Sequence, residues 1–472
     1  MLEALRRWYR GSPESPYVRP WGLSAPIAVL IVCLPLLRPL WEDPTQQSDN
    51  ERARLATVAA IVERKSLAID GAQLWNIRER ICLPDGNPDK SAHRSYSAQP
   101  PVLAACLAIP YWLLHRLGFT FEHNYAVTTY LLTLLGSTLP VAVAAGIVYR
   151  LGRLFELHRL WRALLAFASV FGSGLISYAT VINAHAPAAA LMLAACGSFY
   201  HAAIARNRGE GHSWLALAGF AAALAAVIDL GSLVFMVLLI LVILAMRWSP
   251  TARVGGILWY LLGALPPLAL HAALTVPITG DLLPGFLHPE LRPITAVADP
   301  PPAPPDAEDE EAPAGPTAME RALLRLLDGT LGPHGLLSHF PLVLLGIGGI
   351  GVVLHRHWPV ATKMLAVVTL ASALIVVLAY AILGADWDQP MFATRWYVPF
   401  LPMIVFWTGA LLRQGHHPAA WTAAGLLLGF SVLVSMLGAT APFVRARHGE
   451  HTAYAAARQI YTAARTAPLI NK

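Results

Sequence analysis

The sequence predicts an all-α polytopic membrane protein. Of its 472 residues, 56% are hydrophobic and 13% are charged, whereas a soluble domain carries about 25% charged residues. The second observation is a series of apolar runs, each close to the roughly 20 residues that a helix needs to cross a bilayer. Together they exclude a disordered chain, a nucleic-acid-binding domain and an ordinary cytosolic enzyme.

The net charge of +6 has two explanations. An excess of Lys and Arg is found in proteins that bind polyanions, but in a membrane protein it reflects the basic residues of cytoplasmic loops, and we adopt the second explanation. The four cysteines show no CxxC spacing and therefore predict neither a disulfide framework nor a zinc site.

The apolar runs predict about eleven transmembrane helices. They lie near residues 22–40, 124–149, 162–182, 186–205, 214–229, 230–246, 255–276, 340–354, 364–384, 396–412 and 419–439. The first run follows a polar leader, residues 1–21, and no small-x-small cleavage site follows it. We therefore expect a retained membrane anchor rather than a signal peptide.

The basic residues orient the chain. The leader carries four arginines, so the positive-inside rule predicts a cytoplasmic N-terminus. Five linkers are also basic and must share that side: residues 150–162, 206–208, 247–253, 356–363 and Arg413. The apolar stretch 102–117 would break this alternation if it crossed the membrane, and Pro110 interrupts it. We therefore expect an interfacial helix on the outer face.

The predicted transmembrane core covers residues 22–412, and residues 413–472 form the last transmembrane helix and a C-terminal tail. Nearly all the polar segments lie on the predicted outer side. They are a first loop of residues 42–123, a second loop of residues 277–339, and the tail. In the second loop, residues 299–316 contain seven prolines, six acidic residues and no basic residue. Such a composition predicts a disordered, solvated linker, although it also suits a binding segment for a basic partner.

Two amphipathic helices are predicted on the outer side. In the tail from Phe443 to Arg465, one helical face carries Tyr454, Ala457, Ile460 and Tyr461. In the first loop, apolar residues recur with helical spacing at Leu55, Val58, Ala59 and Val62. Ser48 and Glu51 have capping-box spacing ahead of this second helix, which puts Asp49 at its first position. Acidic residues favour helix N-termini, so spacing alone leaves both a capping and a catalytic role open.

Four motifs in order resemble one family of membrane enzymes. The first is Asp49-Asn50-Glu51, just after the membrane anchor, and the second is HRSYSAQPP at residues 93–101, followed by the interfacial helix. The third is GPHGLLSHFP at residues 332–341, and the fourth is RWYVPFLP at residues 395–402. This arrangement resembles the GT-C glycosyltransferases of the dolichyl-phosphate-mannose protein mannosyltransferase and aminoarabinose transferase type.

The resemblance implies a sugar donor on a polyprenyl phosphate, with the lipid tail in the bilayer and the sugar outside. An acceptor hydroxyl attacks the anomeric carbon in one inverting displacement, and a carboxylate takes its proton. The family's base corresponds to Asp49, with Glu51 beside it. The leaving phosphate needs a cation, and Arg395 suits it because Arg binds phosphate oxygens bidentately. An interfacial anchor is the alternative role for Arg395.

One departure from the family concerns the donor phosphate. Many relatives have Lys immediately before the Pro-Pro pair, where this chain has Gln99. Lys90, His93 and Arg94 are the nearby residues that would compensate for the missing cation, and each has an alternative role as an ordinary loop residue.

Further substrate-contact candidates lie at the same outer rim: Tyr96, His185, Asp229, His334 and His339. Alternatives are a hairpin connection for His185, a turn for Asp229 and non-catalytic roles for the two later histidines. Asp386 and Asp388 precede Arg395 and are expected to pair with it. Because the chain has no HExxH, EF-hand or clustered His/Cys motif, we expect no cofactor and no required metal, although some GT-C enzymes use a divalent ion.

The sequence and the resemblance thus predict a glycosyltransferase on the outer face of a bacterial cytoplasmic membrane. Its expected partners are the polyprenyl-phosphate sugar, a lipid, glycan or protein acceptor, and membrane lipids, with no nucleic acid. A transporter or lipid flippase is the alternative, but those proteins typically have inverted repeats and charges near the bilayer midplane. A third interpretation, an inactive scaffold, stays open because of Gln99.

Overall fold

The computed structural model describes residues 20–37, 48–70, 77, 80–84, 93–205, 208–246, 249–291, 317–384, 391–413, 418–444, 446–447 and 449–466. Most of the predicted leader, the predicted disordered segment 299–316, Lys90, Asp386 and Asp388 lie outside these residues, as does the side chain of His93.

Each of the eleven predicted spans contains helix. These helices are α2 (Pro20–Leu36), α5 and α6 (Tyr125–Thr133 and Leu139–Leu151), α7 (Arg159–Phe171), α8 (His185–Ile204), α9 (Arg208–Ile228), α10 (Ser232–Ala245), α11 (Pro250–Thr279), α14 (Val343–His355), α15 (Val360–Leu383), α16 and α17 (Leu401–Phe406 and Thr408–Leu412) and α18 (Pro418–Thr440). Among the described residues, six helices are long and apolar enough to cross a membrane by themselves. The protein is therefore a multi-pass membrane protein.

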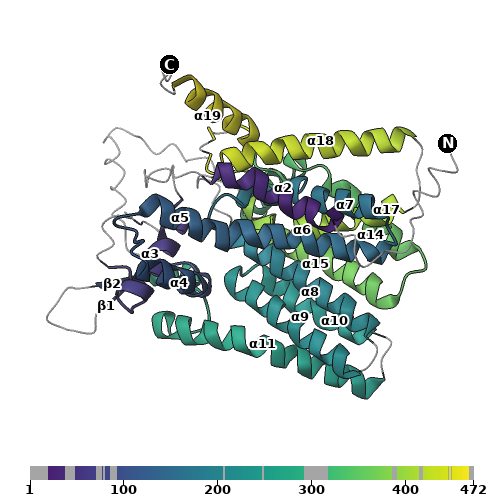
Figure 1. Ribbon diagram of the computed structural model, residues 1–472, viewed down its shortest axis with the longest axis horizontal. Helices are drawn as coiled ribbons and strands as arrows, with labels where there is room; N and C mark the ends of the chain where they lie inside the picture. Colours follow the sequence, from purple (N-terminus) through teal and green to yellow (C-terminus); the bar gives the residue numbers. More distant parts are fainter. Residues whose placement is uncertain are drawn as a thin grey trace.

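One end of the helix bundle is covered by the first loop, and we call it the capped end. It holds α3 (Asp49–Glu63), the hairpin of β1 (Arg80–Pro84) and β2 (His93–Ser97), and α4 (Pro101–Arg116). The spanning helices run across the view in Figure 1, whereas α4 is seen nearly end-on. This helix therefore lies across the end of the bundle, as expected of an interfacial helix.

Side chains of three predicted basic linkers meet at the opposite end of the bundle. Arg413 forms an ion pair with Glu156 at 2.7 Å, and the ring of Phe155 lies 5.9 Å from that of Trp358. Residues 150–162, 356–363 and Arg413 thus share one end, as the charge distribution predicts.

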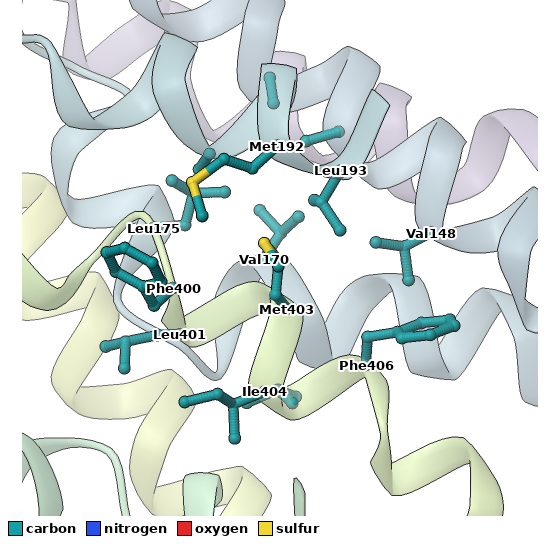
Figure 2. Close-up of a cluster of buried hydrophobic side chains, with 14 of the residues drawn as sticks. Val148, Val170, Leu175, Met192, Leu193, Phe400, Leu401, Met403, Ile404 and Phe406 are labelled. Carbon is teal, nitrogen blue, oxygen red and sulfur yellow. The ribbon is translucent and has the colours of Figure 1, made fainter. Parts of the chain in front are cut away.

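The core lies where α6, α7 and α8 meet α16 (Figure 2). Val170 of α7 and Met192 of α8 are fully buried, and Met403 of α16 is 1% exposed. On its other side α16 and the following turn contact α14 through glycine: a Cβ on Gly349 would lie 2.0 Å from the carbonyl oxygen of Trp407. Small residues allow such close approach of membrane helices, and this packing fixes the segment that follows Arg395.

A single turn of π-helix, η3 (Leu134–Thr138), joins α5 to α6 within one span. Its side chains bond to the 3₁₀ turn η5 (Leu175–Tyr178) and the residues after it: the Thr138 hydroxyl donates to the Ala179 carbonyl at 2.7 Å. Gly136 faces the other way, and a Cβ there would lie 2.9 Å from Leu107 of α4. Such turns insert one extra residue into a helix and often mark functional sites.

The 3₁₀ turn η4 (Gly152–Phe155) lies at the opposite end, and the other remaining elements cover the capped end. They are η6 (Gly285–Leu287), η7 (Pro289–Leu291), α12 (Ala318–Thr330), α13 (Leu336–His339), η8 (Arg395–Tyr397) and α19 (Thr452–Thr466). The tail helix was predicted, but its packing differs. Tyr454 and Tyr461 of the predicted apolar face are 66% exposed, whereas Ala455 and Ala456 are buried, because the helix contacts α18 through its small residues.

Candidate active site

Three buried charged side chains from distant parts of the chain lie at the capped end. Glu51 is in the first turn of α3, Asp229 directly follows α9, and Arg395 begins η8. Each residue is only 6% exposed. Since burying a charge is unfavourable unless another charge or a hydrogen bond compensates it, these three residues mark the capped end as the candidate site.

Tyr178 of η5 lies among these charges. Its hydroxyl is within electrostatic range of both Glu51 and Arg395 and donates a hydrogen bond to the carbonyl of Phe392. The Tyr178 ring also meets the His185 ring edge-on, with 6.2 Å between their centroids. Tyr178 thus links α3, α8 and the segment before Arg395.

His185 and Asp229 form the second contact of the site. The His185 Nδ1 atom lies 2.6 Å from the Asp229 Oδ2 atom. His185 is held at the start of α8 because the Asn183 side-chain oxygen accepts from the backbone N–H of Ala186 at 2.8 Å. Asp229 also accepts from the N–H of Gly231 at 3.2 Å. The predicted turn at Asp229 is therefore present, and the same carboxyl reaches His185.

Aromatic rings surround Arg395. Its guanidinium carbon lies 5.5 Å from the ring centroid of Trp396, and Tyr380 of α15 stacks on Trp396 at 5.4 Å. Tyr380 is within electrostatic range of both Asp229 and Arg395. We call the six residues Glu51, Tyr178, His185, Asp229, Tyr380 and Arg395 the polar cluster.

The two acids of the first motif point in different directions. Positions i and i+2 of a helix do not share a face, and Asp49 accordingly leaves 23% of its side chain exposed and pairs with Arg52, while Glu51 is buried. The predicted capping box is not formed: within described residues 48–70, the Ser48 side chain makes no capping hydrogen bond. The Glu51 side chain is instead buried within electrostatic range of Tyr178.

Gln99, the departure from the family, contacts α3 directly. Its side-chain nitrogen donates to the side-chain oxygen of Asn50 at 2.7 Å, and its oxygen accepts from Arg54 at 3.4 Å. Arg54 is 5% exposed and lies one helical turn after Glu51. The structure therefore places a buried arginine beside Gln99.

The hairpin residues lie outside the polar cluster. Tyr96 is paired with Ile81 across the hairpin and packs in a small apolar group with Ile81 and Ala98. Arg94 is exposed. The structure thus assigns Tyr96 to the hairpin's own packing.

The two later histidines contact the residues before Arg395 rather than the cluster. His339 is fully buried, and this burial lowers its pKa to about 3. Its Nε2 atom lies 2.7 Å from the Thr452 hydroxyl. The His334 ring contacts Asp328 at 3.3 Å, and its carbonyl accepts from Thr394.

An apolar cavity of about 410 Å³ opens between α4, η3, α6, α8 and α9. We call it the lateral groove. Its lining includes Leu107, Gly136, Val143, Ala190, Leu224 and Ile228. Ile228 immediately precedes Asp229, and the lining residue Pro187 lies two residues after His185. One end of the groove therefore lies beside the His185–Asp229 pair.

Sequence reasoning missed Arg54, Tyr178 and Tyr380. Arg54 resembles a surface residue of an amphipathic helix, and the two tyrosines lie in apolar runs, where aromatic residues are common in the core. Among the described residues, no group of three or more His, Cys, Asp or Glu side chains is placed to bind a metal ion. Metal independence stays a prediction.

Three solved structures resemble the fold. ArnT from Cupriavidus metallidurans matches in the apo state, with 13% identity and TM-score 0.49 over 86% of this chain and 62% of that one. Its complex with undecaprenyl phosphate matches with 12% identity and TM-score 0.50 over 88% and 63%. An oligosaccharyltransferase from Archaeoglobus fulgidus in the apo form matches with 12% identity and TM-score 0.47 over 91% and 57%.

No protein-family model matches the sequence, and no curated protein matches it. The chain spans less than two thirds of the length of each structure above. At TM-score 0.50, the ArnT complex supports a common fold. The chain therefore has the fold of that ArnT structure, which agrees with the fold that its motifs predicted.

Proposed function

We propose that this GT-C-fold protein transfers one sugar from a polyprenyl-phosphate donor to an acceptor at the capped end. The observation that carries the proposal is that the His185–Asp229 pair of the polar cluster lies beside one end of the lateral groove. An apolar groove that ends at buried charges suits a ligand with a long apolar tail and an anionic head. ArnT itself is seen with undecaprenyl phosphate.

The lateral groove binds the apolar tail of the donor in this proposal. Its described lining is apolar, from Leu107 of α4 to Ile228 of α9. The tail can therefore pack against the lining without leaving a buried polar group unsatisfied. The donor phosphate lies at the end of the groove near Arg395. Arg54 is the second cation and takes the part played by lysine in relatives, beside Gln99.

The transfer is a single displacement at the anomeric carbon. A bond forms between the acceptor oxygen and that carbon, the bond from the carbon to the phosphate oxygen breaks, and polyprenyl phosphate leaves with the electron pair. The acceptor proton moves to the Asp49 carboxylate, whose partly exposed side chain is accessible to an acceptor outside the membrane. Inversion of the anomeric configuration follows from one displacement.

Glu51 has a different role from Asp49. Its buried carboxylate compensates the charge of Arg395 across Tyr178, which is within range of both. When the donor site is empty, Glu51 and Arg395 then compensate each other's charge, and Arg395 is not an isolated buried cation. The His185–Asp229 pair lies at the same end of the groove and contacts the sugar.

The proposed orientation follows the basic linkers. Residues at the end opposite the capped end include Arg413 and the linker of residues 150–162, so the positive-inside rule puts that end in the cytoplasm. The N-terminus is then cytoplasmic, and the capped end faces outward from a bacterial cytoplasmic membrane. The acceptor is a lipid, glycan or protein on that side.

The test uses protein purified into lipid nanodiscs with radiolabelled polyprenyl-phosphate sugars. Wild type is compared with Arg395→Ala and with Arg116→Ala, which removes an exposed arginine of α4 at the same end. The expected result is sugar transfer or donor hydrolysis that Arg395→Ala loses and Arg116→Ala retains. Movement of a labelled lipid between leaflets without release of sugar would instead support the flippase alternative.

A further inference from the structure

The residues just before Arg395 adopt an unusual backbone conformation. Ala393 has φ of +50°, in the left-handed region that residues other than glycine rarely adopt. It is fully buried and lies two residues before Arg395. Strained backbone persists where surrounding contacts hold it, and it is often found at functional sites.

Contacts from outside the segment hold it in this conformation. The carbonyl of Phe392 accepts from Tyr178 of the polar cluster. The backbone N–H of Met391 donates to the carbonyl of Val444 at 3.2 Å, and the N–H of Ala393 donates to the Thr452 hydroxyl oxygen at 3.0 Å. Two of these contacts therefore come from the part of the chain that follows α18.

The Thr452 hydroxyl group both donates and accepts a hydrogen bond. The Nδ1 atom of His339 lies 2.8 Å from the Gly335 carbonyl, and a carbonyl only accepts, so Nδ1 carries the hydrogen and Nε2 accepts. The Thr452 hydroxyl donates to Nε2 at 2.7 Å and accepts from Ala393. Burial favours the neutral histidine that this arrangement needs, because it lowers the His339 pKa to about 3.

The Thr452 backbone is fixed as well. Its N–H donates to the carbonyl of Pro333 at 3.1 Å, and its side chain is fully buried. One threonine thus joins α19, the motif of residues 332–341 and the segment before Arg395. A helix that only covers the surface would not need such a contact.

We propose that Thr452 is a positioning residue for Arg395, since its bond to Ala393 holds the backbone that directs the guanidinium toward the donor phosphate. The inference rests on the proposed function, because the phosphate-binding role of Arg395 belongs to it. It assigns the start of the C-terminal helix to the active site.

The experiment compares Thr452→Val, which has a similar shape but no hydroxyl, with Thr452→Ser, which keeps the hydroxyl. Thr462→Val is the matched control, since the Thr462 hydroxyl lies on an exposed part of α19 and bonds to the carbonyl of Arg458. Two quantities are measured: hydrogen exchange of the Ala393 amide, and KM for the polyprenyl-phosphate sugar separately from kcat.

Thr452→Val is expected to raise both amide exchange and donor KM about tenfold, the effect of losing one hydrogen bond. Thr452→Ser and Thr462→Val are expected to match wild type. If Thr452→Val does not fold, Thr452→Cys, with its weak donor and acceptor, is expected to show smaller shifts in the same direction.

Faster Ala393 exchange with an unchanged donor KM would overturn the positioning role. Unchanged exchange would overturn the hydrogen-bond assignment itself. A wild-type protein that turns over no donor, yet shows the exchange difference, would refute the proposed function and leave the structural link between Thr452 and Ala393 intact.

Discussion

The Nδ1 atom of His185 lies 2.6 Å from the Asp229 Oδ2 atom, and this contact joins the start of α8 to the residue after α9. The Asp229 side chain is 5% exposed and that of His185 14%. The pair adjoins one end of the lateral groove, because the lining residues Ile228 and Pro187 are close in sequence to Asp229 and His185. The contact therefore joins two of the helices that line the groove.

Loss of one member of this pair is expected to reduce transfer strongly. His185→Ala leaves the buried Asp229 carboxyl without this contact, which costs about 1–3 kcal/mol of stability, and sugar transfer is expected to fall about 10-fold to 100-fold. The matched control is His288→Ala, which removes the histidine from a part-buried pair with Asp281 outside the polar cluster. Initial rates and melting temperatures of both variants check this, and an equal effect of the two substitutions would contradict it.

The two acids of the first motif are expected to respond differently to neutralisation. Asp49→Asn removes the proposed base and is expected to lower kcat by about 10² to 10⁴, with little change in donor KM. Glu51→Gln removes one of the negative charges near Arg395 in the free enzyme and is expected to alter donor KM. Steady-state kinetics of both variants decide the assignment. Normal kcat in Asp49→Asn and a collapsed kcat in Glu51→Gln would make Glu51 the base.

Restoring the family's lysine at Gln99 is expected to harm this protein. The new ammonium group would lie beside the buried guanidinium of Arg54, whose nitrogen is 3.4 Å from the Gln99 oxygen, and like charges in a buried site repel strongly. Gln99→Lys alone is expected to lower stability and donor binding, and Gln99→Lys with Arg54→Gln to restore both. Titration with undecaprenyl phosphate in nanodiscs measures this. A gain of binding in the single variant would show that Arg54 has not taken over the lysine's role.

Filling the lateral groove is expected to discriminate donors by tail length. Ala190 lines the groove and is 7% exposed, so Ala190→Phe places a ring where the tail binds. Donor KM is expected to rise about tenfold or more for long polyprenyl chains and less for a short-chain analogue, because a long tail buries more apolar surface in the groove than a short one. Leu217→Phe, on the exposed surface of α9, is the control. Identical KM values for Ala190→Phe and wild type would exclude the groove as the tail site.

Acid is expected to destabilise the fold through His339. Its folded pKa of about 3 is below the ordinary value of about 6.5 that it regains on unfolding. Between these two pKa values the unfolded state binds a proton that the folded state does not, so stability falls as the pH drops below about 6.5. At pH 5 the loss is roughly 2 kcal/mol. Burial also lowers the pKa of the stacked His451, which adds in the same direction.

His339→Gln removes this titration and keeps polar side-chain atoms. Melting temperatures in detergent at pH 7.5 and pH 5 are expected to differ less in this variant than in wild type. Equal differences would show that the neutral histidine does not contribute to the acid sensitivity.

Much of the fold follows from the sequence because bilayer-spanning helices leave a strong local signal. Apolar runs and basic linkers are sufficient to locate the helices of the bundle and to distinguish them from α4, which lies across its end. The site depends on contacts between distant segments, and here local patterns mislead. Glu51 has capping-box spacing, yet its side chain is buried near Tyr178. Arg54 and Tyr380 belong to the site only because the start of α3 and the end of α15 lie at the same end of the bundle.

The histidines of the GPHGLLSHFP motif show a related limit. The sequence motif predicts that His334 and His339 contact substrate, and this stays a prediction. In the structure the two residues contact Thr394 and Thr452, which no sequence pattern singles out. The residues of a motif can therefore hold the backbone near a site without contacting the substrate themselves.

Because of the π turn η3, the two halves of one span direct their side chains independently. The turn contains one extra residue, and an α-helix advances about 100° per residue. The side chains of α5 are therefore rotated by about that angle relative to those of α6. Deleting one residue from the turn, such as Ser137, would rotate the α5 half by about that angle relative to the α6 half. Thr128 and Leu132, now buried, would turn away from their neighbours. Insertions and deletions in this turn thus change which surface the capped end presents, while the opposite half of the span keeps its packing.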